Sequence, residues 1–176
     1  MANTIEQRTR LFDGVKFSVD KVELTTKDGQ HVTREAVVHP GAVIVLPILD
    51  DGRIVMIRNH RFVVGEELYE LCAGTLEPNE GPAVCAGREL IEETGYQAGS
   101  IEPLCDFYTS PGFCNERIYA FLARDLKHVG QQLEATENII VEPLAMDDVL
   151  AMTRDGRICD GKTIAALLYY QTFNAG

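Results

Sequence analysis

Three glutamates near the middle of the chain are spaced for a shared task. Glu89, Glu92 and Glu93 stand at i, i+3 and i+4, so on a helix they project from one face. Three like charges repel one another there, and near a helix C-terminus the macrodipole disfavours each by roughly 0.3–1 kcal/mol. A divalent cation removes this repulsion, and carboxylate oxygens are the ligands that Mg²⁺ and Mn²⁺ prefer. The spacing therefore predicts a metal site, although on the helix alone a solvated acidic face is an equal alternative.

The residues around these glutamates mark the ends of a helix. We expect the helix to run from about Glu80 to Thr94. Asn79 can cap its N-terminus, and Pro82 suits the first turn. Gly95 is typical of a C-terminal stop. The three carboxylates therefore lie close to the C-terminal end of the helix.

The first 40 residues predict a β extension with a small apolar content. Residues 1–10 are polar and are expected to be loosely ordered, whereas 11–24 alternate and pair with 31–38 as a hairpin. Such a hairpin has little core of its own, so it should pack on the rest of the chain or on a second subunit. We therefore divide the chain into an extension, 1–40, and a main domain, 41–176.

The main domain reads as short strands with few helices. Residues 42–49 are a continuous apolar run suited to a buried strand, and 54–62 returns beside it. Further strands are expected at 67–72, 101–108, 117–123 and 139–144, and helices at 146–153 and 161–173. In the last helix the expected core residues are Ile164, Leu167, Leu168 and Phe173. This mixture predicts an α/β or α+β sandwich.

Composition narrows the classes of function. A net charge of −11 over 176 residues argues against binding nucleic acid. No apolar run approaches the roughly 20 residues that cross a bilayer, and the N-terminus lacks a signal-peptide pattern, so no membrane association and a cytoplasmic location are expected. The five cysteines are scattered without a C-x-x-C pair. They are interpreted as reduced, buried thiols rather than as disulfides or a zinc site.

The glutamates belong to a longer pattern. Gly74, Glu80, Arg88, the three glutamates and Gly95 fill every fixed position of G-x5-E-x7-R-E-U-x-E-E-x-G-U, with Tyr96 in place of a final aliphatic residue. This pattern resembles the signature of the Nudix hydrolases. The resemblance implies an α/β/α sandwich with a mixed sheet, in which a Mg²⁺-activated water (or a Mn²⁺-activated one) attacks a diphosphate.

The same resemblance assigns roles to the motif residues. Glu89 and Glu93 would be direct metal ligands, with Glu92 as a further carboxylate of the metal and catalytic centre, and the carbonyl of Ala73 as an extra ligand. Glu92 and Glu93 would thus also be catalytic residues. Gly74, Gly95 and an Arg88–Glu80 ion pair would hold the loop and helix of the motif together, and the ion pair would orient Glu89.

Segments outside the motif resemble the ADP-ribose pyrophosphatase branch of that family. The loop 108–116 contains Ser-Pro-Gly with Pro111 at the offset that marks this branch, which implies substrate binding by Pro111, Gly112 and Glu116. A tight turn is the alternative interpretation. The approach 68–74 also resembles the branch, with Cys72 where proline is usual. The implied substrate is ADP-ribose or a related nucleoside diphosphate sugar.

Further site residues follow from the resemblance. It implies a homodimer that exchanges the N-terminal extension, with Phe17 stacking on the base; a core phenylalanine is the alternative. Arg34 and Arg61 would hold phosphate or ribose, or instead be surface arginines or ion-pair partners. Glu137, with Glu134 second, would supply an extra catalytic carboxylate unless 132–138 is a plain solvated loop.

Other functions stay open at this point. Another Nudix substrate, such as a dinucleoside polyphosphate, a coenzyme A derivative or GDP-mannose, would use the same motif. A non-catalytic nucleotide sensor is a different class, but retention of all motif carboxylates favours an enzyme. Gly161-Lys162-Thr163 lacks the upstream glycine of a phosphate-binding loop, so no such loop is assigned there.

Overall fold

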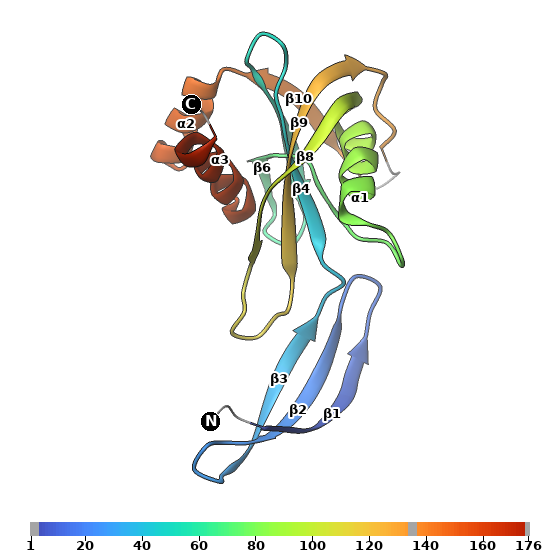
Figure 1. Ribbon diagram of the computed structural model, residues 1–176, viewed down its shortest axis with the longest axis vertical. Helices are drawn as coiled ribbons and strands as arrows, with labels where there is room; N and C mark the ends of the chain where they lie inside the picture. Colours follow the sequence, from blue (N-terminus) through green and yellow to red (C-terminus); the bar gives the residue numbers. More distant parts are fainter. Residues whose placement is uncertain (1–3, 134–136, 175–176) are drawn as a thin grey trace. The chain divides into compact units, whose positions relative to one another are not determined.

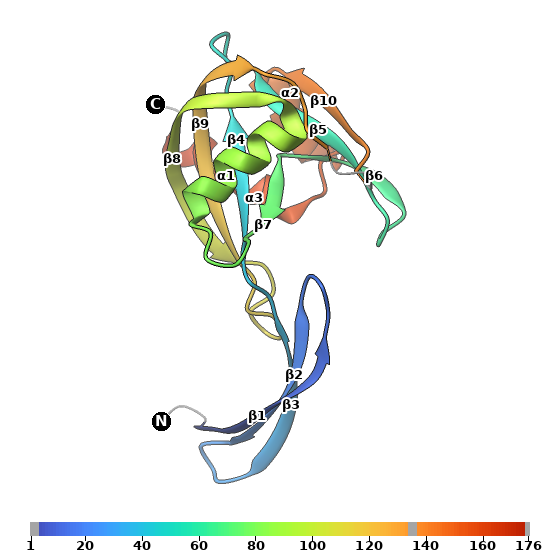
Figure 2. The same cartoon turned by 90° about the vertical axis from the view of Figure 1, so that its right-hand side faces the viewer.

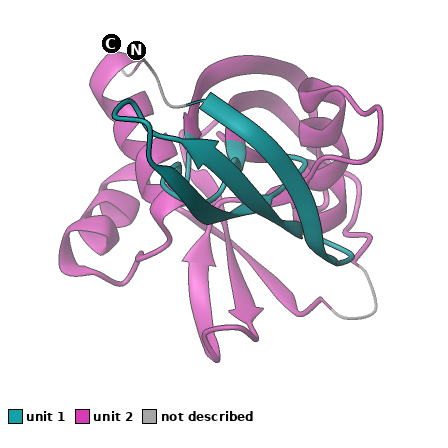
Figure 3. Ribbon diagram, turned by 90° about the horizontal axis from the view of Figure 1, so that it is seen from below, with its two compact units in different colours: residues 1–41, 108–117 teal, residues 42–107, 118–176 magenta. Residues whose placement is uncertain are grey.

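The computed structural model describes residues 4–133 and 137–174. The chain divides into two compact units, shown in two colours in Figure 3: residues 1–41 with 108–117, and residues 42–107 with 118–176. Each unit is described by itself below, with the element labels of Figure 1.

The first unit is built on a three-stranded antiparallel sheet. Its strands are β1 (Thr4–Asp13), β2 (Ser18–Thr25) and β3 (His31–Val38), in that order across the sheet. The expectation that residues 1–10 are loosely ordered was therefore wrong from Thr4 onward. All ten β1 residues are exposed, so no apolar alternation marks the strand, and backbone pairing with β2 holds it instead.

The loop 108–117 is attached to β3 within the same unit. The Phe113 carbonyl accepts from Val37 N at 2.7 Å, and Asn115 N donates to the Val37 carbonyl at 3.2 Å. The Asn115 side chain also accepts from His39 N at 2.7 Å. Residues that are far apart in sequence are thus joined by backbone hydrogen bonds.

The second unit contains two sheets (Figures 1 and 2). The four-stranded mixed sheet has the order β7 (Ala73–Thr75), β4 (Ala42–Pro47), β9 (Arg117–His128) and β8 (Tyr96–Tyr108), with β4 and β9 parallel. The three-stranded sheet has the order β10 (Ile139–Leu144), β5 (Ile54–Arg61) and β6 (Glu66–Glu70). The helical elements are α1 (Pro82–Glu89), the π-helix η1 (Leu90–Thr94), α2 (Met146–Asp155) and α3 (Gly161–Phe173).

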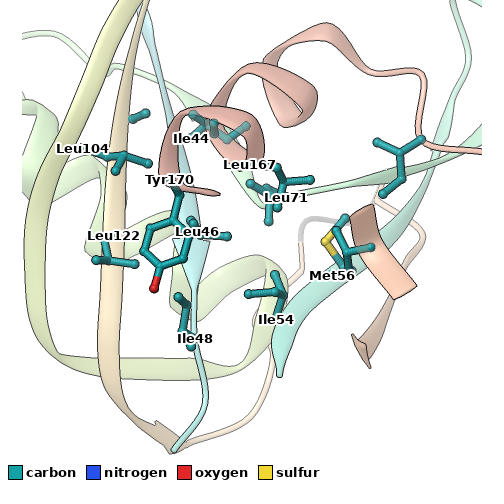
Figure 4. Close-up of a cluster of buried hydrophobic side chains, with 14 of the residues drawn as sticks. Ile44, Leu46, Ile48, Ile54, Met56, Leu71, Leu104, Leu122, Leu167 and Tyr170 are labelled. Atoms are coloured by element: carbon teal, nitrogen blue, oxygen red, sulfur yellow. The ribbon is translucent and has the colours of Figure 1, made fainter. Parts of the chain in front are cut away.

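The central strand β4 serves two apolar layers. Ile44 and Leu46 pack in one cluster with residues of α2 and α3, drawn in Figure 4. Val43 and Val45 pack in a second cluster with α1 and η1. Figures 1 and 2 show α1 on one side of β4 and β9 and the other two helices on the opposite side. A strand buried on both faces explains the continuous apolar run, and the expected α+β sandwich with a mixed sheet is confirmed.

Two details of the expected packing were wrong. Residues 54–61 do not return beside β4: they form the middle strand of the other sheet, and only an isolated bridge joins Ile48 to Ile54. In α3 the buried face consists of Thr163, Ala166, Leu167 and Tyr170. Leu168 is 46% exposed because it lies off this i, i+3, i+4, i+7 face, and Phe173, the last residue of α3, is 70% exposed.

The cysteines divide by environment. Cys72 and Cys85 are buried, Cys159 is exposed, and the described cysteines are free thiols. The expectation of five buried thiols is therefore wrong for Cys159. Among the described residues, no helix combines the length and the apolar character that crossing a membrane requires.

Candidate active site

The motif helix changes its hydrogen-bond pattern in the middle of the carboxylate cluster. Its α-helical part begins after Gly81 with Pro82 in the first turn, and ends at Glu89. The five residues of η1 then continue as a π-helix, a widened turn that is frequent at functional sites. Asn79 is not the N-cap, since it lies two residues earlier with φ 64. Gly95 is the expected stop, with a left-handed φ of 73.

Glu93 is a buried carboxylate on η1. It is 4% exposed, and its Oε2 accepts from the backbone N of Ala73 at 2.9 Å. The pKa of Glu93 is raised to about 8, mainly by burial; the Ala73 hydrogen bond opposes this rise, and the nearby Glu89 and Glu137 carboxylates contribute to it. This carboxyl group therefore favours a bound proton or a nearby cation at neutral pH.

Glu89 lies directly over Gly74. A Cβ built on Gly74 would overlap the Glu89 carboxylate, so only glycine leaves room for it. Burial raises the pKa of Glu89, and the charges of Glu92 and Glu137 act in the same direction. The charge of Glu137 thus raises the pKa of both Glu89 and Glu93. Glu134 lies outside the described residues.

Arg88 is the cation of the motif. It donates to both oxygens of Glu80, Nε to Oε1 and Nη2 to Oε2, each at 2.9 Å, and this confirms the expected ion pair. Its Nη1 donates to Glu89 at 2.8 Å and to Glu92 at 2.9 Å. Arg88 holds the pKa of Glu80 at about 2. One guanidinium faces three carboxylates here, so the cluster keeps a negative charge before Glu93 is counted.

The donor chemistry of the cluster fits a hard divalent cation. Glu93 is buried and Glu89 is partly buried, and the pKa of each is raised, so a cation would stabilise both in their charged form. Within residues 4–133 and 137–174, no group of three or more metal-ligating side chains is assembled around one point. Arg88 draws Glu89 and Glu92 toward itself, which accounts for this arrangement. At Ala73 the observed contact is through its N–H, and the carbonyl ligand stays a prediction.

The C-terminal end of η1 is fastened to the segment 129–132. Val129 N and Gly130 N donate to the Gly95 carbonyl at 2.7 and 3.2 Å. The side chain of Gln131 donates to the Glu93 carbonyl at 2.7 Å, and Gln132 N donates to the Glu92 carbonyl at 3.0 Å. A Cβ on Gly95 would meet this segment at 2.8 Å. These contacts hold η1 and Gly95 against residues 129–132.

Arg61 forms an ion pair, the alternative that the sequence left open. Its Nε and Nη2 donate to Glu70 at 2.7 and 2.6 Å, and Lys162 donates to the same carboxylate at 2.9 Å. The Arg61 charge also lowers the pKa of Glu93, and β5, which ends at Arg61, contacts η1. Sequence reasoning missed Glu70 and Lys162. In the sequence, Glu70 could have been found from its place shortly before Ala73, and Lys162 from the Gly161-Lys162-Thr163 segment.

The remaining site residues belong to the first unit. Phe17 is 45% exposed with its ring 6.2 Å from that of Phe12, so it is not a core residue. Arg34 is exposed and donates to the Thr33 carbonyl at 2.7 Å. Glu116 accepts from the Thr109 hydroxyl at 2.7 Å and lies 3.6 Å from His39 Nδ1. Pro111 and Gly112 form the turn of this loop.

Replacement of Gly74 tests the placement of Glu89. We expect Gly74→Ala to push the Glu89 carboxylate aside and to lower activity by roughly 10- to 100-fold, the usual cost of misplacing a metal-site group. Because the displaced atoms end a flexible side chain, Tm should change little. The matched control is Gly81→Ala, where an added Cβ meets open space and activity should stay within about twofold. Equal activities of the two variants would contradict the assignment.

Comparison with known proteins places the chain in a family. A model of the NUDIX domain matches residues 38–166, and the chain belongs to this family, whose hydrolases generally depend on a divalent metal. A solved structure of an ADP compounds hydrolase superimposes with a TM-score of 0.87 over 98% of this chain and 94% of that one, at 21% identity. The structural match confirms the expected fold.

The chain is also similar in sequence, over most of its length, to proteins of three named activities. A methanol dehydrogenase activator of Bacillus methanolicus is 40% identical over 97% of this chain and 96% of its own. An ADP-ribose pyrophosphatase of Bacillus subtilis (strain 168) is 37% identical over 96% and 94%. A GDP-mannose pyrophosphatase of Escherichia coli is 38% identical over 85% and 84%.

Proposed function

We propose that this protein hydrolyses the diphosphate bond of ADP-ribose or a related nucleoside diphosphate sugar in a Mg²⁺-dependent reaction. Water adds to one phosphorus and the anhydride P–O bond breaks, so that a nucleoside monophosphate and a sugar phosphate leave. The observation that carries the proposal is the buried Glu93 carboxylate, which accepts from Ala73 N, with the partly buried Glu89 carboxylate over Gly74 in an intact motif. The similarity to an ADP-ribose pyrophosphatase over 96% of the chain supports the choice of substrate.

The motif residues would hold the metal. Glu89 and Glu93, with Glu92 and the Ala73 carbonyl, would ligate Mg²⁺, for which Mn²⁺ can substitute. A bound Mg²⁺ lowers the pKa of a water ligand and neutralises phosphate charge. Ligation would free Glu89 and Glu92 from Arg88, which keeps its bidentate pair with Glu80 and so stays in place.

Proton transfer is assigned to a carboxylate outside the helix. Glu137 would accept the proton of the attacking water, and its influence on the pKa of both Glu89 and Glu93 supports this role. Glu134 is the second candidate. Glu92 and Glu93 complete the catalytic set, and Arg61 would bind a phosphate oxygen of the substrate.

The first unit is assigned to substrate contacts and dimerisation. Phe17 would stack on the base, Arg34 would bind phosphate or ribose, and the loop residues Pro111, Gly112 and Glu116 would shape the substrate site. Exposure of Ile5, Leu11 and Phe12 on the outer strand β1 supports a homodimer, since a second subunit would cover these side chains.

GDP-mannose is a second candidate substrate within the same chemistry. The relative from Escherichia coli named for that activity is 38% identical over 85% of this chain. Both candidates are nucleoside diphosphate sugars, so the motif would act on them in the same way. The choice between them depends on the base contacts of the first unit.

A substrate panel tests the proposal. The protein with Mg²⁺ is incubated with ADP-ribose, GDP-mannose, a dinucleoside polyphosphate and coenzyme A, and nucleotide release is followed by chromatography. We expect AMP and ribose 5-phosphate from ADP-ribose, and no release when a chelator is present. Release from none of these compounds would reject the proposal, and tight binding without release would indicate a nucleotide sensor.

A further inference from the structure

Glu70 is a buried carboxylate that two cations hold at once. It is 1% exposed and lies three residues before Ala73, at the end of β6. Arg61 donates to both of its oxygens, at 2.7 and 2.6 Å, and Lys162 donates to Oε2 at 2.9 Å. A carboxylate buried to this degree is destabilising unless it is paired. One cation would satisfy that need, so the second requires a reason.

Lys162 is itself held in place by the N-terminus of α3. Its Nζ donates to Asp160 Oδ1 at 2.9 Å, and its side chain is 18% exposed. Asp160 caps the helix by accepting from the backbone N and the hydroxyl of Thr163, at 3.0 and 2.6 Å. The buried Thr163 hydroxyl then accepts from Leu71 N at 3.0 Å. Lys162 and Thr163 therefore join the start of α3 to Glu70 and Leu71, and this segment continues to Ala73.

Arg61 is the more exposed of the two cations. Its side chain is 40% exposed, compared with 18% for Lys162. Arg61 is the last residue of β5, and β5 contacts the η1 turn that carries Glu93. When Arg61 leaves, the remaining Glu70, Asp160 and Lys162 carry a net charge of −1, and the Lys162 ammonium would still contact both carboxylates. Glu70 therefore keeps one cation after Arg61 leaves, provided that Lys162 stays.

We propose that Lys162 is a positioning residue that keeps Glu70 paired while Arg61 turns from Glu70 to the diphosphate of the substrate. This inference rests on the proposed function, which assigns Arg61 to a phosphate oxygen. Without Lys162, departure of Arg61 would leave Glu70 buried and unpaired. Arg61 would then remain on Glu70, and the substrate would lose a phosphate contact.

Substrate affinity tests this role without reliance on turnover. The Kd for ADP-ribose is measured by calorimetry with chelator present, and KM and kcat are measured with Mg²⁺. We expect Lys162→Met to raise Kd and KM roughly tenfold, the cost of one charge-assisted hydrogen bond, with kcat within about twofold. Lys162→Arg should restore affinity because it restores the cation. Lys127→Met, an exposed site on β9, is the matched control for net charge.

A double variant separates positioning from general damage. In a Glu70→Gln background the buried charge is gone, so adding Lys162→Met should change Kd no further. An equal loss of affinity in both backgrounds, an unchanged Kd, or a loss confined to kcat would overturn the proposal. Binding of ADP-ribose by the unmodified protein without cleavage would reject the proposed function alone, whereas absence of binding would reject both.

Discussion

Glu93→Gln should lower kcat by roughly three orders of magnitude, because a metal ligand supplies several kcal/mol of transition-state stabilisation. Glutamine has nearly the same shape, and its amide oxygen can still accept the hydrogen bond from Ala73 N. The variant should therefore fold. Steady-state hydrolysis of ADP-ribose with Mg²⁺ measures the loss.

The control for this experiment is an exposed glutamate. Glu102 is exposed on β8, and Glu102→Gln changes the net charge by the same amount as Glu93→Gln, so it should leave kcat unchanged. Circular dichroism and Tm verify that both variants are folded. Activity of the Glu93 variant within tenfold of the unmodified protein would show that its carboxylate is not a metal ligand.

The metal-free protein should lose stability as pH rises from about 4.5 to about 8. The pKa of Glu93 is about 8 in the folded chain against 4.5 ordinarily, so the folded state binds the extra proton in this window. Stability is then fully present below pH 4.5 and falls as pH rises through 8, by on the order of 4 kcal/mol. Burial also raises the pKa of Glu89, so its deprotonation lowers stability in the same direction as pH rises. Glu80 acts in a separate acid window, since its pKa is lowered to about 2.

Urea unfolding at pH 5 and pH 9 with chelator present measures this effect. Glu93→Gln should be more stable than the unmodified protein at pH 9 and similar to it at pH 5. Addition of Mg²⁺ at pH 9 should recover the lost stability of the unmodified protein, because ligation stabilises the charged carboxylates. A pH profile that is identical in the two proteins would contradict the burial argument.

The sequence predicted those parts of the fold that carry a strong local pattern. The apolar run at 42–49 and the helix 161–173 correspond to β4 and α3, and Gly95 ends the motif helix. β1 escaped prediction because both of its faces are exposed and no periodicity distinguishes them. The π-turn escaped because a shift in backbone hydrogen bonding leaves no mark in side-chain spacing.

The site was predictable where residues lie close in sequence. The spacing of the motif carboxylates indicates a candidate metal site, and the resemblance to the family signature implies the Arg88–Glu80 pair. The Glu70–Lys162 pair joins positions 92 residues apart, and each member on its own reads as an ordinary surface residue. Only tertiary structure shows that Glu70 is buried and needs both partners.

The parallel pairing of β4 with β9 has a consequence for how the protein folds. Ala42–Pro47 must find Ile118–Ala123 across an intervening chain that itself forms β5 to β8 and the motif helix, and the entropy of closing this segment is lost before the contacts form. β4 also bridges both apolar layers, so neither layer is complete until the pairing exists. We expect the motif carboxylates to assemble only late in folding, so that binding of an added divalent cation during refolding would report completion of the core rather than formation of the motif helix.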